Sequence, residues 1–250
     1  MSGHSKWASI KHKKAVVDAR RGKLFTKLAR AITVAAKEGG SGDIEGNPAL
    51  ALAVQKAKDA SMPKDNIERA IAKGTGAGAD ADSFEPVLYE AYGPGGVALL
   101  IDALTDNRNR TGSEVRHLLS KHGGNLGEPG SVAYLFDKKG LIVVDASRYS
   151  EDDLMPAVDA GAEDIALDDD VYEIVTEPSD FAAVRAALEE AGVAFESAEV
   201  TQQPKTRVPL DEESARKLMK LIDALEDNDD VGAVHANFEV DAEILERVAG

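Results

Sequence analysis

Apolar positions recur at helical spacing in the first third of the chain. Between residues 19 and 40, Leu24 and Leu28 lie on one face of a helix that a Gly-Gly pair would end. The Asn-Pro pair at 47–48 is a start signal for a second helix, because Asn is a favoured N-cap and Pro fits the first turn. A third helical pattern covers 62–74 and ends at a glycine. Together these patterns predict a small bundle of three amphipathic helices.

The hydrophobic period changes after residues 74–83, a linker rich in Gly, Ala and Asp. Two strands are expected on either side of the turn Gly93-Pro94-Gly95-Gly96. A helix is expected over 111–124, with Thr111 or Ser113 near its N-cap, and a strand over 131–136. This part of the chain therefore mixes helices and strands.

From residue 140 the predicted order is strand, helix, strand, strand, helix, strand, which is the ferredoxin-like pattern. The chain then returns to a helix over 211–227 and a strand over 232–240. Because a lone terminal strand needs a partner, we expect it to pair with the strands that precede the ferredoxin-like unit. The predicted fold class is α+β with three domains: an N-terminal three-helix bundle at 1–76, a middle α+β domain at 83–136 and 206–250, and a ferredoxin-like domain at 137–205 inserted in it.

Charge is divided unevenly along the chain. The formal net charge of the 250 residues is −16, yet residues 1–37 hold ten Lys or Arg against one acid. Residues 75–250 hold 14 bases against 38 acids. A contrast of this size favours an anionic partner for the first segment. The alternative is a solvated basic helix that complements the acidic body.

Two stretches carry the candidate binding chemistry. Residues 3–14, GHSKWASIKHKK, contain four Lys suited to phosphates and a Trp that either stacks on a base or anchors the segment to the bundle. In TDNRNRT at 105–111, two Arg either fork onto phosphates at a helix N-terminus or pair with nearby acids in a structural turn. The candidate nucleic-acid-binding residues are Lys6, Trp7, Lys11, His12, Lys13, Lys14, Arg20, Arg21, Lys23, Lys27, Arg30, Arg108 and Arg110.

The sequence contains no complete motif of the enzyme and metal-binding classes considered. The stretch at 93–98 matches G-x-G-x-x-A, but it lies between two strands and opens no helix, so it is a hairpin turn. The acidic runs at 168–170 and 226–230 lack the Gly of a calcium loop and are expected to be solvated turns. We therefore expect no catalytic residue, no cofactor, no metal ion and no small-molecule substrate.

The location expected for the protein is the cytoplasm. The chain has no Cys, which fits a reducing compartment, and basic residues interrupt the apolar positions near its N-terminus. Its apolar runs are shorter than the roughly 18 residues that span a bilayer, so no membrane partner is expected.

Five ordered blocks carry a family resemblance: SGHSKWASIKHKK, RRGKLFTKLARAITVAAKEGG, MPKDNIERAIAKG, LTDNRNRT and GGNLGEPGSVAYLF. Together they resemble the YebC/PmpR family, which includes the mitochondrial translational activator of cytochrome c oxidase. The resemblance runs over nearly the whole chain and is densest through residue 136. It implies a three-domain α+β protein and a role as a probable DNA-binding transcriptional regulator, or as a translation factor acting at the ribosome.

The leading expectation is therefore a non-enzymatic, nucleic-acid-binding regulator of gene expression. Its partner would be DNA or ribosomal RNA, with the ribosome as a further partner in the translational alternative. The acidic body is repelled by a bare duplex, and no helix-turn-helix pattern with a recognition helix is evident. A second alternative is a protein-interaction adaptor whose basic segment docks on an acidic partner.

Overall fold

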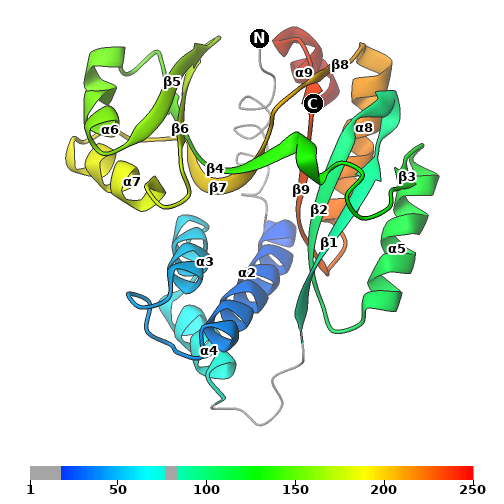
Figure 1. Ribbon diagram of the computed structural model, residues 1–250, viewed down its shortest axis with the longest axis horizontal. Helices are drawn as coiled ribbons and strands as arrows, with labels where there is room; N and C mark the ends of the chain where they lie inside the picture. The colour runs from blue at the N-terminus through cyan, green and yellow to red at the C-terminus, as the bar shows by residue number, and fades with distance from the viewer. Residues whose placement is uncertain (1–17, 77–83, 250) are drawn as a thin grey trace.

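Three helices form a bundle at one end of the molecule. The structure, a computed structural model, describes residues 18–76 and 84–249. The first of these ranges, called the helical unit below, contains α2 (Asp18–Glu38), α3 (Pro48–Asp59) and α4 (Lys64–Gly74) (Figure 1). Its core is made by residues of all three helices, among them Ile32, Leu50 and Ile67. The predicted three-helix bundle is confirmed.

The second range, called the body below, begins with a four-stranded sheet. Its strands lie in the order β3-β1-β2-β9. They span Asn125–Leu126 (β3), Glu85–Tyr92 (β1), Ala98–Thr105 (β2) and Val231–Ala236 (β9). One face packs on α5 (Arg108–Lys121) and α8 (Glu212–Glu226), with Leu99 and Ile101 of β2 contacting Val115 and Leu218 in one apolar cluster (Figure 1).

A second four-stranded sheet forms the ferredoxin-like unit. Its antiparallel order is β5-β6-β4-β7, with β4 at Phe136–Asp145, β5 at Ala162–Asp168, β6 at Val171–Thr176 and β7 at Ser197–Pro204. The short α6 (Met155–Asp159) and α7 (Phe181–Glu190) pack on one face of it. The α+β class and the three-part layout are thereby confirmed.

The terminal strand β9 pairs with β2 in antiparallel register, Ile101 opposite Val234. The chain therefore leaves the first sheet after β3, builds the whole ferredoxin-like unit, and returns to the first sheet through α8. This connection is the one that an inserted domain requires. The domain limits themselves stay a prediction.

Three local predictions were wrong. Residues 131–136 do not form a strand: a 3-10 turn covers Ala133–Leu135, and the strand begins at Phe136. The reason is the buried carboxylate of Glu90, which accepts the backbone N–H groups of Gly130, Val132 and Ala133 that a strand ladder would otherwise use.

The other two concern the start of α5 and the terminal strand expected over 232–240. Helix α5 begins at Arg108, not at Thr111 or Ser113, because the side chain of Asn107 caps it by accepting the backbone N–H of Arg110. The strand expected over 232–240 is divided in two: β9 ends at Ala236, and β10 (Phe238–Glu239) belongs to another sheet, where it pairs in parallel with β8 (Val208–Pro209). The chain then ends in α9 (Ala242–Ala249), a helix that the sequence pattern did not predict.

Candidate nucleic-acid interface

The structure describes the side chains of five of the candidate binding residues: Lys23, Lys27, Arg30, Arg108 and Arg110. Lys6, Trp7, Lys11, His12, Lys13 and Lys14 lie outside the described residues. Arg20 and Arg21 lie on α2, and their side chains are also outside the described part. Their predicted role stays a prediction.

Lys23, Lys27 and Arg30 form a line of cations along α2, here called the basic stripe. Their spacing of four and three residues places them on one face of the helix, about 6 and 4.5 Å apart along its axis. The stripe faces residues 226–230, here called the acidic turn, which begin at the last residue of α8 and end just before β9. The structure thus brings these three predicted residues together.

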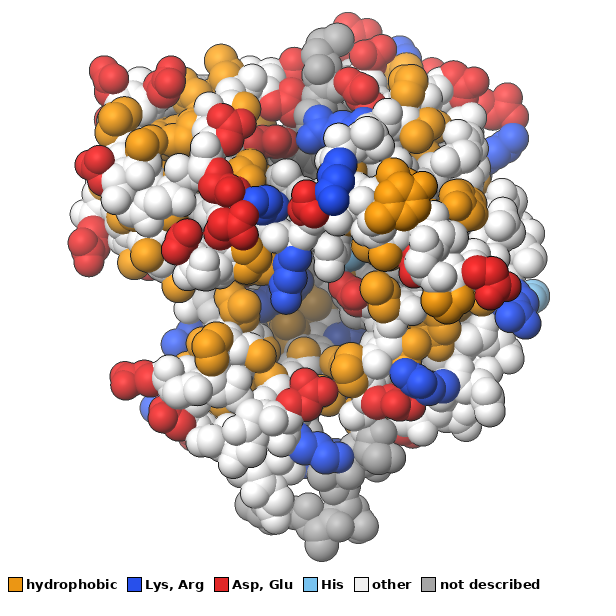
Figure 2. Space-filling view, in the orientation of Figure 1, with side chains coloured by type: hydrophobic (Ala, Val, Ile, Leu, Met, Phe, Trp, Pro, Cys, Tyr) orange, Lys and Arg blue, Asp and Glu red, His pale blue; other side chains and the backbone are white. Residues whose placement is uncertain are grey.

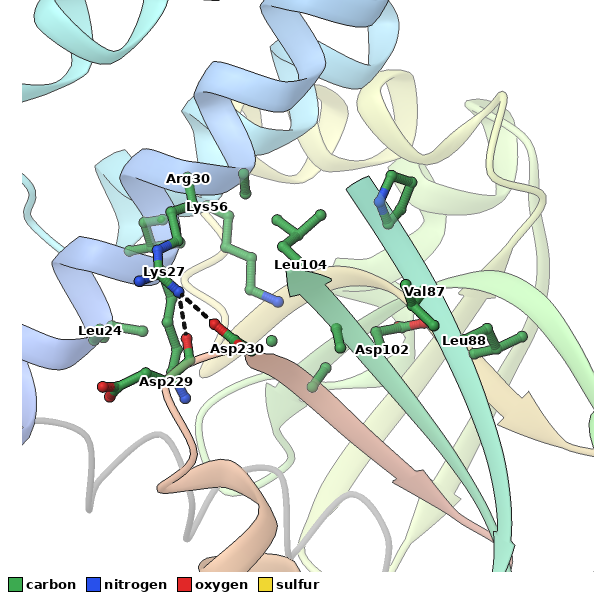
Figure 3. Close-up of a pocket in the computed structure, with 16 residues that line it drawn as sticks. Leu24, Lys27, Arg30, Lys56, Val87, Leu88, Asp102, Leu104, Asp229 and Asp230 are labelled. Atoms are coloured by element: carbon green, nitrogen blue, oxygen red, sulfur yellow. Dashed lines mark hydrogen bonds and ion pairs between the residues drawn. The ribbon is translucent and has the colours of Figure 1, made fainter. Parts of the chain in front are cut away.

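Every member of the basic stripe is bonded to the acidic turn. The Lys23 ammonium donates to the Asp227 carboxylate at 2.9 Å, and the Lys27 ammonium donates to the Glu226 carbonyl oxygen. The Arg30 guanidinium donates to the Asp229 carbonyl oxygen at 2.9 Å and to the Asp230 carboxylate at 3.1 Å (Figure 3).

The position of the acidic turn favours cations. Its carboxylates lie at the C-terminal end of α8, where unpaired carbonyl groups carry partial negative charge. Hydrogen bonding to Asp227 and its charge raise the pKa of Lys23, whereas burial lowers the pKa of Lys27 despite the nearby acids. The stripe is therefore exposed at Lys23 and partly desolvated at Lys27.

Asp230 connects the helical unit to the body. Its side chain is only 6% exposed. Besides Arg30, it accepts from the Arg110 guanidinium at 2.6 Å and from the Thr111 hydroxyl at 2.7 Å. Burial raises the pKa of Asp230, but the hydrogen bonds from Arg110 and Thr111 and the charges of Arg110 and Arg30 outweigh it and hold this pKa below its usual value. The prediction of a solvated turn at 226–230 was wrong for Asp230, which is buried among its partners, whereas the side chains of Asp227 and Asp229 are exposed.

Arg108 and Arg110 occupy the first turn of α5, each beside an acid. Arg108 Nε lies 3.0 Å from a Glu85 carboxylate oxygen, and Arg110 also bonds Asp106 at 2.7 Å. Bonds to Asp230 and Asp106 raise the pKa of Arg110, so it stays cationic. Both contacts fit the structural alternative that the sequence left open. Phosphate binding by these two residues stays a prediction.

A cleft of about 430 Å³ separates the helical unit from the first sheet. Leu24 of α2 lies on one side of it, and Leu88 and Leu104 of the sheet lie on the other (Figure 3); Leu28 also lines it. Figure 2 shows this hollow with hydrophobic side chains at its floor and Lys or Arg side chains beside it. The basic stripe and the acidic turn meet at its edge.

Lys56 is a cation of this cleft that the sequence did not single out. It extends from α3 into the cleft (Figure 3). Its ammonium pairs with Glu199 of the ferredoxin-like unit at 3.1 Å. On the outer side of the body, α5 carries exposed Arg116 and Lys121. The sequence signal for Arg116 and Lys121 was the charge of residues 108–121, which hold four bases and one acid within an otherwise acidic body.

Within the described ranges, no group of three or more His, Asp or Glu side chains is placed to hold a metal ion. Nor is any helix in these ranges long and apolar enough to cross a membrane.

A basic helical unit joined to two α+β units defines the class of protein, and comparison with known families identifies it. The model described as the TACO1/YebC protein N-terminal domain matches residues 5–77, and that described as the TACO1/YebC second and third domain matches residues 84–238. The chain belongs to the TACO1/YebC family. The resemblance seen in the sequence is confirmed.

Relatives share the full length of the chain. A protein of Rubrobacter xylanophilus is 59% identical over all of both chains, and one of Acidothermus cellulolyticus is 57% identical over 99% of this chain and 100% of its own. Each is named a probable transcriptional regulatory protein. The crystal structure of a conserved hypothetical protein, Aq1575 of Aquifex aeolicus, is 52% identical with a TM-score of 0.83, covering 96% of this chain and 99% of that one.

Proposed function

We propose that the protein is a non-enzymatic regulator of transcription that binds DNA through its basic N-terminal part. The observation that carries this proposal is the basic stripe, whose three side chains converge on anionic and carbonyl oxygens within the molecule. Phosphate groups offer oxygens of the same kind, and Lys and Arg bind them by charge-assisted hydrogen bonds. The names of the close relatives support the regulatory role.

The distribution of charge indicates which part of the chain attracts DNA. Residues 1–74 carry a net charge of +8, and residues 75–250 carry −24. DNA is therefore attracted to the helical unit and the residues before it, and repelled by the body. Such repulsion weakens binding to an arbitrary duplex, so contacts beyond simple charge attraction must contribute to any stable complex.

The test is fluorescence anisotropy of the full-length protein with a labelled DNA duplex of about 20 base pairs. We expect the triple variant Lys11→Glu, Lys13→Glu, Lys14→Glu to weaken binding about tenfold or more, since several phosphate contacts are lost. The matched control is Arg216→Glu, Lys217→Glu, Lys220→Glu on the exposed face of α8, which changes the net charge equally. Its effect should be within about threefold, since only long-range charge changes.

Equal losses in the two triple variants would contradict binding through the N-terminal part. Single-stranded RNA of the same length is titrated in parallel. Tighter binding of RNA than of the duplex would contradict the transcriptional role and favour the translational alternative. Circular dichroism of each variant verifies that it is folded.

A further inference from the structure

We infer that the acidic turn competes with nucleic acid for the basic stripe, so that DNA reaches these side chains only after the turn is displaced. This inference rests on the proposed function and adds a regulatory step to the same site. The acidic turn would act as an internal stand-in for a phosphate backbone. It would keep the stripe neutralised until a ligand with several anionic groups replaces it.

The contact satisfies the electrostatic condition for such competition. Each cation of the stripe already has an oxygen partner in the turn, so a phosphate must exchange with that partner. The outermost pair, Lys23 with Asp227, has side chains 49% and 71% exposed. Exposed pairs of this kind are weak and screened by salt. Exchange can therefore begin at Lys23.

The innermost pair, Arg30 with Asp230, can separate without leaving a buried charge unpaired. When Arg30 leaves Asp230, the carboxylate keeps its hydrogen bonds from Arg110 and Thr111, both of which belong to the body. Arg30 itself is about a quarter exposed and would exchange a carboxylate for a phosphate. The large cost of stranding an unpaired buried ion is therefore avoided.

Packing allows the helical unit to move. Its apolar core and that of the first sheet form separate clusters, and the cleft of about 430 Å³ lies between them. The helical unit is held instead by the ferredoxin-like unit: Leu52 of α3 packs on its core, and Lys56 pairs with Glu199. In addition, Arg185 of α7 binds both carboxylate oxygens of Asp59 at 2.8 Å. Arg185 is 9% exposed and lies over the Phe195 ring. We expect this bidentate pair to act as the pivot when the acidic turn separates from α2.

The test compares two substitutions that reduce the negative charge of the acidic turn with two that reduce the charge elsewhere. Asp227→Asn with Asp229→Asn removes two negative charges from the turn and leaves the buried Asp230 intact. The control, Glu151→Gln with Asp152→Asn, removes two negative charges from exposed positions of the ferredoxin-like unit. The turn variant should bind the labelled duplex about two- to fivefold more tightly than the control, the range expected from an exposed ion pair.

Opening is measured directly as a distance. Because the chain has no Cys, Glu68→Cys in α4 and Lys220→Cys in α8 give two unique sites for spin labels. We expect the distance distribution between the labels to change when the duplex is added. It should also change in the turn variant without DNA, but not in the control variant.

The outcomes separate the two proposals. If the duplex binds and the distances stay the same, or if the turn and control variants bind equally, the competition is wrong and DNA binding stands. If neither the duplex nor the RNA binds, nucleic-acid binding is wrong, and inorganic polyphosphate then replaces DNA as the probe. A change in distance with polyphosphate would support displacement of the turn by a polyanion, and an unchanged distance would overturn it.

Discussion

Asp230 is the residue on which the helical unit and the body converge. Its carboxylate bonds a guanidinium from α2, and a guanidinium and a hydroxyl from the first turn of α5, while almost no water reaches it. Buried charges are tolerated only when they are paired in this way. Asp229, its neighbour, contributes a backbone carbonyl to Arg30 and has an exposed side chain.

Asp230→Ala should therefore lower the free energy of unfolding by about 3 kcal/mol, since it leaves Arg110, Thr111 and Arg30 without their shared acceptor. The matched change Asp229→Ala should cost less than about 0.5 kcal/mol. Urea unfolding followed by circular dichroism measures both. Equal costs at the two positions would show that the hydrogen bonds of Asp230 do not stabilise the fold.

Glu90 is a second buried carboxylate, and its contribution to the stability of the fold depends on pH. The side chain is 8% exposed and accepts the N–H groups of Gly130, Val132 and Ala133. Burial raises the pKa of Glu90, but these backbone hydrogen bonds outweigh it and bring the pKa below its ordinary value of 4.5. A carboxylate whose pKa is lowered in the folded state stabilises the fold at pH values above its ordinary pKa. This stabilisation is lost as the pH falls through the lowered pKa.

Glu90→Gln should thus cost about 2 kcal/mol at neutral pH, because an amide N–H₂ cannot accept from the backbone donors. The difference in unfolding free energy between the native protein and this variant should stay constant above pH 4.5 and shrink below it. Glu85→Gln, at an exposed site, is the control. A difference that grows as the pH falls would contradict the lowered pKa.

At the scale of elements, the helix starts show which signals a sequence carries well. The Asn47 cap was predicted and is confirmed: its side-chain oxygen accepts the Leu50 N–H at 3.1 Å. The structure adds a tertiary bond, because the amide group of the same side chain donates to the Ala35 carbonyl of α2 at 2.9 Å. This one side chain both starts α3 and joins it to α2.

Asn47→Ala should cost about 2 kcal/mol, since both the cap and the link to α2 are lost. Asn47→Ser keeps an acceptor for the cap but is too short for the link, so its cost should fall between that of Asn47→Ala and zero. Thermal unfolding of the two variants measures this order. If the serine variant is as unstable as the alanine variant, the whole loss of stability comes from the hydrogen bond between Asn47 and the Ala35 carbonyl.

The errors at this scale have a common physical origin. Caps, glycine stops and helical periods depend on near neighbours, so the sequence could predict the bundle and the order of the ferredoxin-like unit. The turn at 133–135 depends on Glu90, some 40 residues earlier, and Asp230 bonds Arg30 of α2, 200 residues earlier. A charged run in the sequence does not show which cations will face it. Partners this distant along the chain were not predictable from local pattern.

At the scale of the whole molecule, the segregation of charge is the central feature. A helical unit of net positive charge lies against a body of net charge −22, and the described contacts between α2 and the acidic turn are polar. The same cations thus serve the fold in the absence of ligand and, in our proposal, DNA in its presence. Salt weakens both contacts, so its net effect depends on how many phosphates replace the acidic turn.

The most direct test of this account is the salt dependence of duplex binding by the native protein. Each phosphate contact contributes a slope of about −0.9 to log K against log salt concentration. With several Lys and Arg contacting the backbone, we expect a total slope of about −3 or steeper, and a shallower one for Lys11→Glu, Lys13→Glu, Lys14→Glu. A flat salt dependence, or a slope that this triple variant leaves unchanged, would contradict DNA binding through the basic N-terminal part.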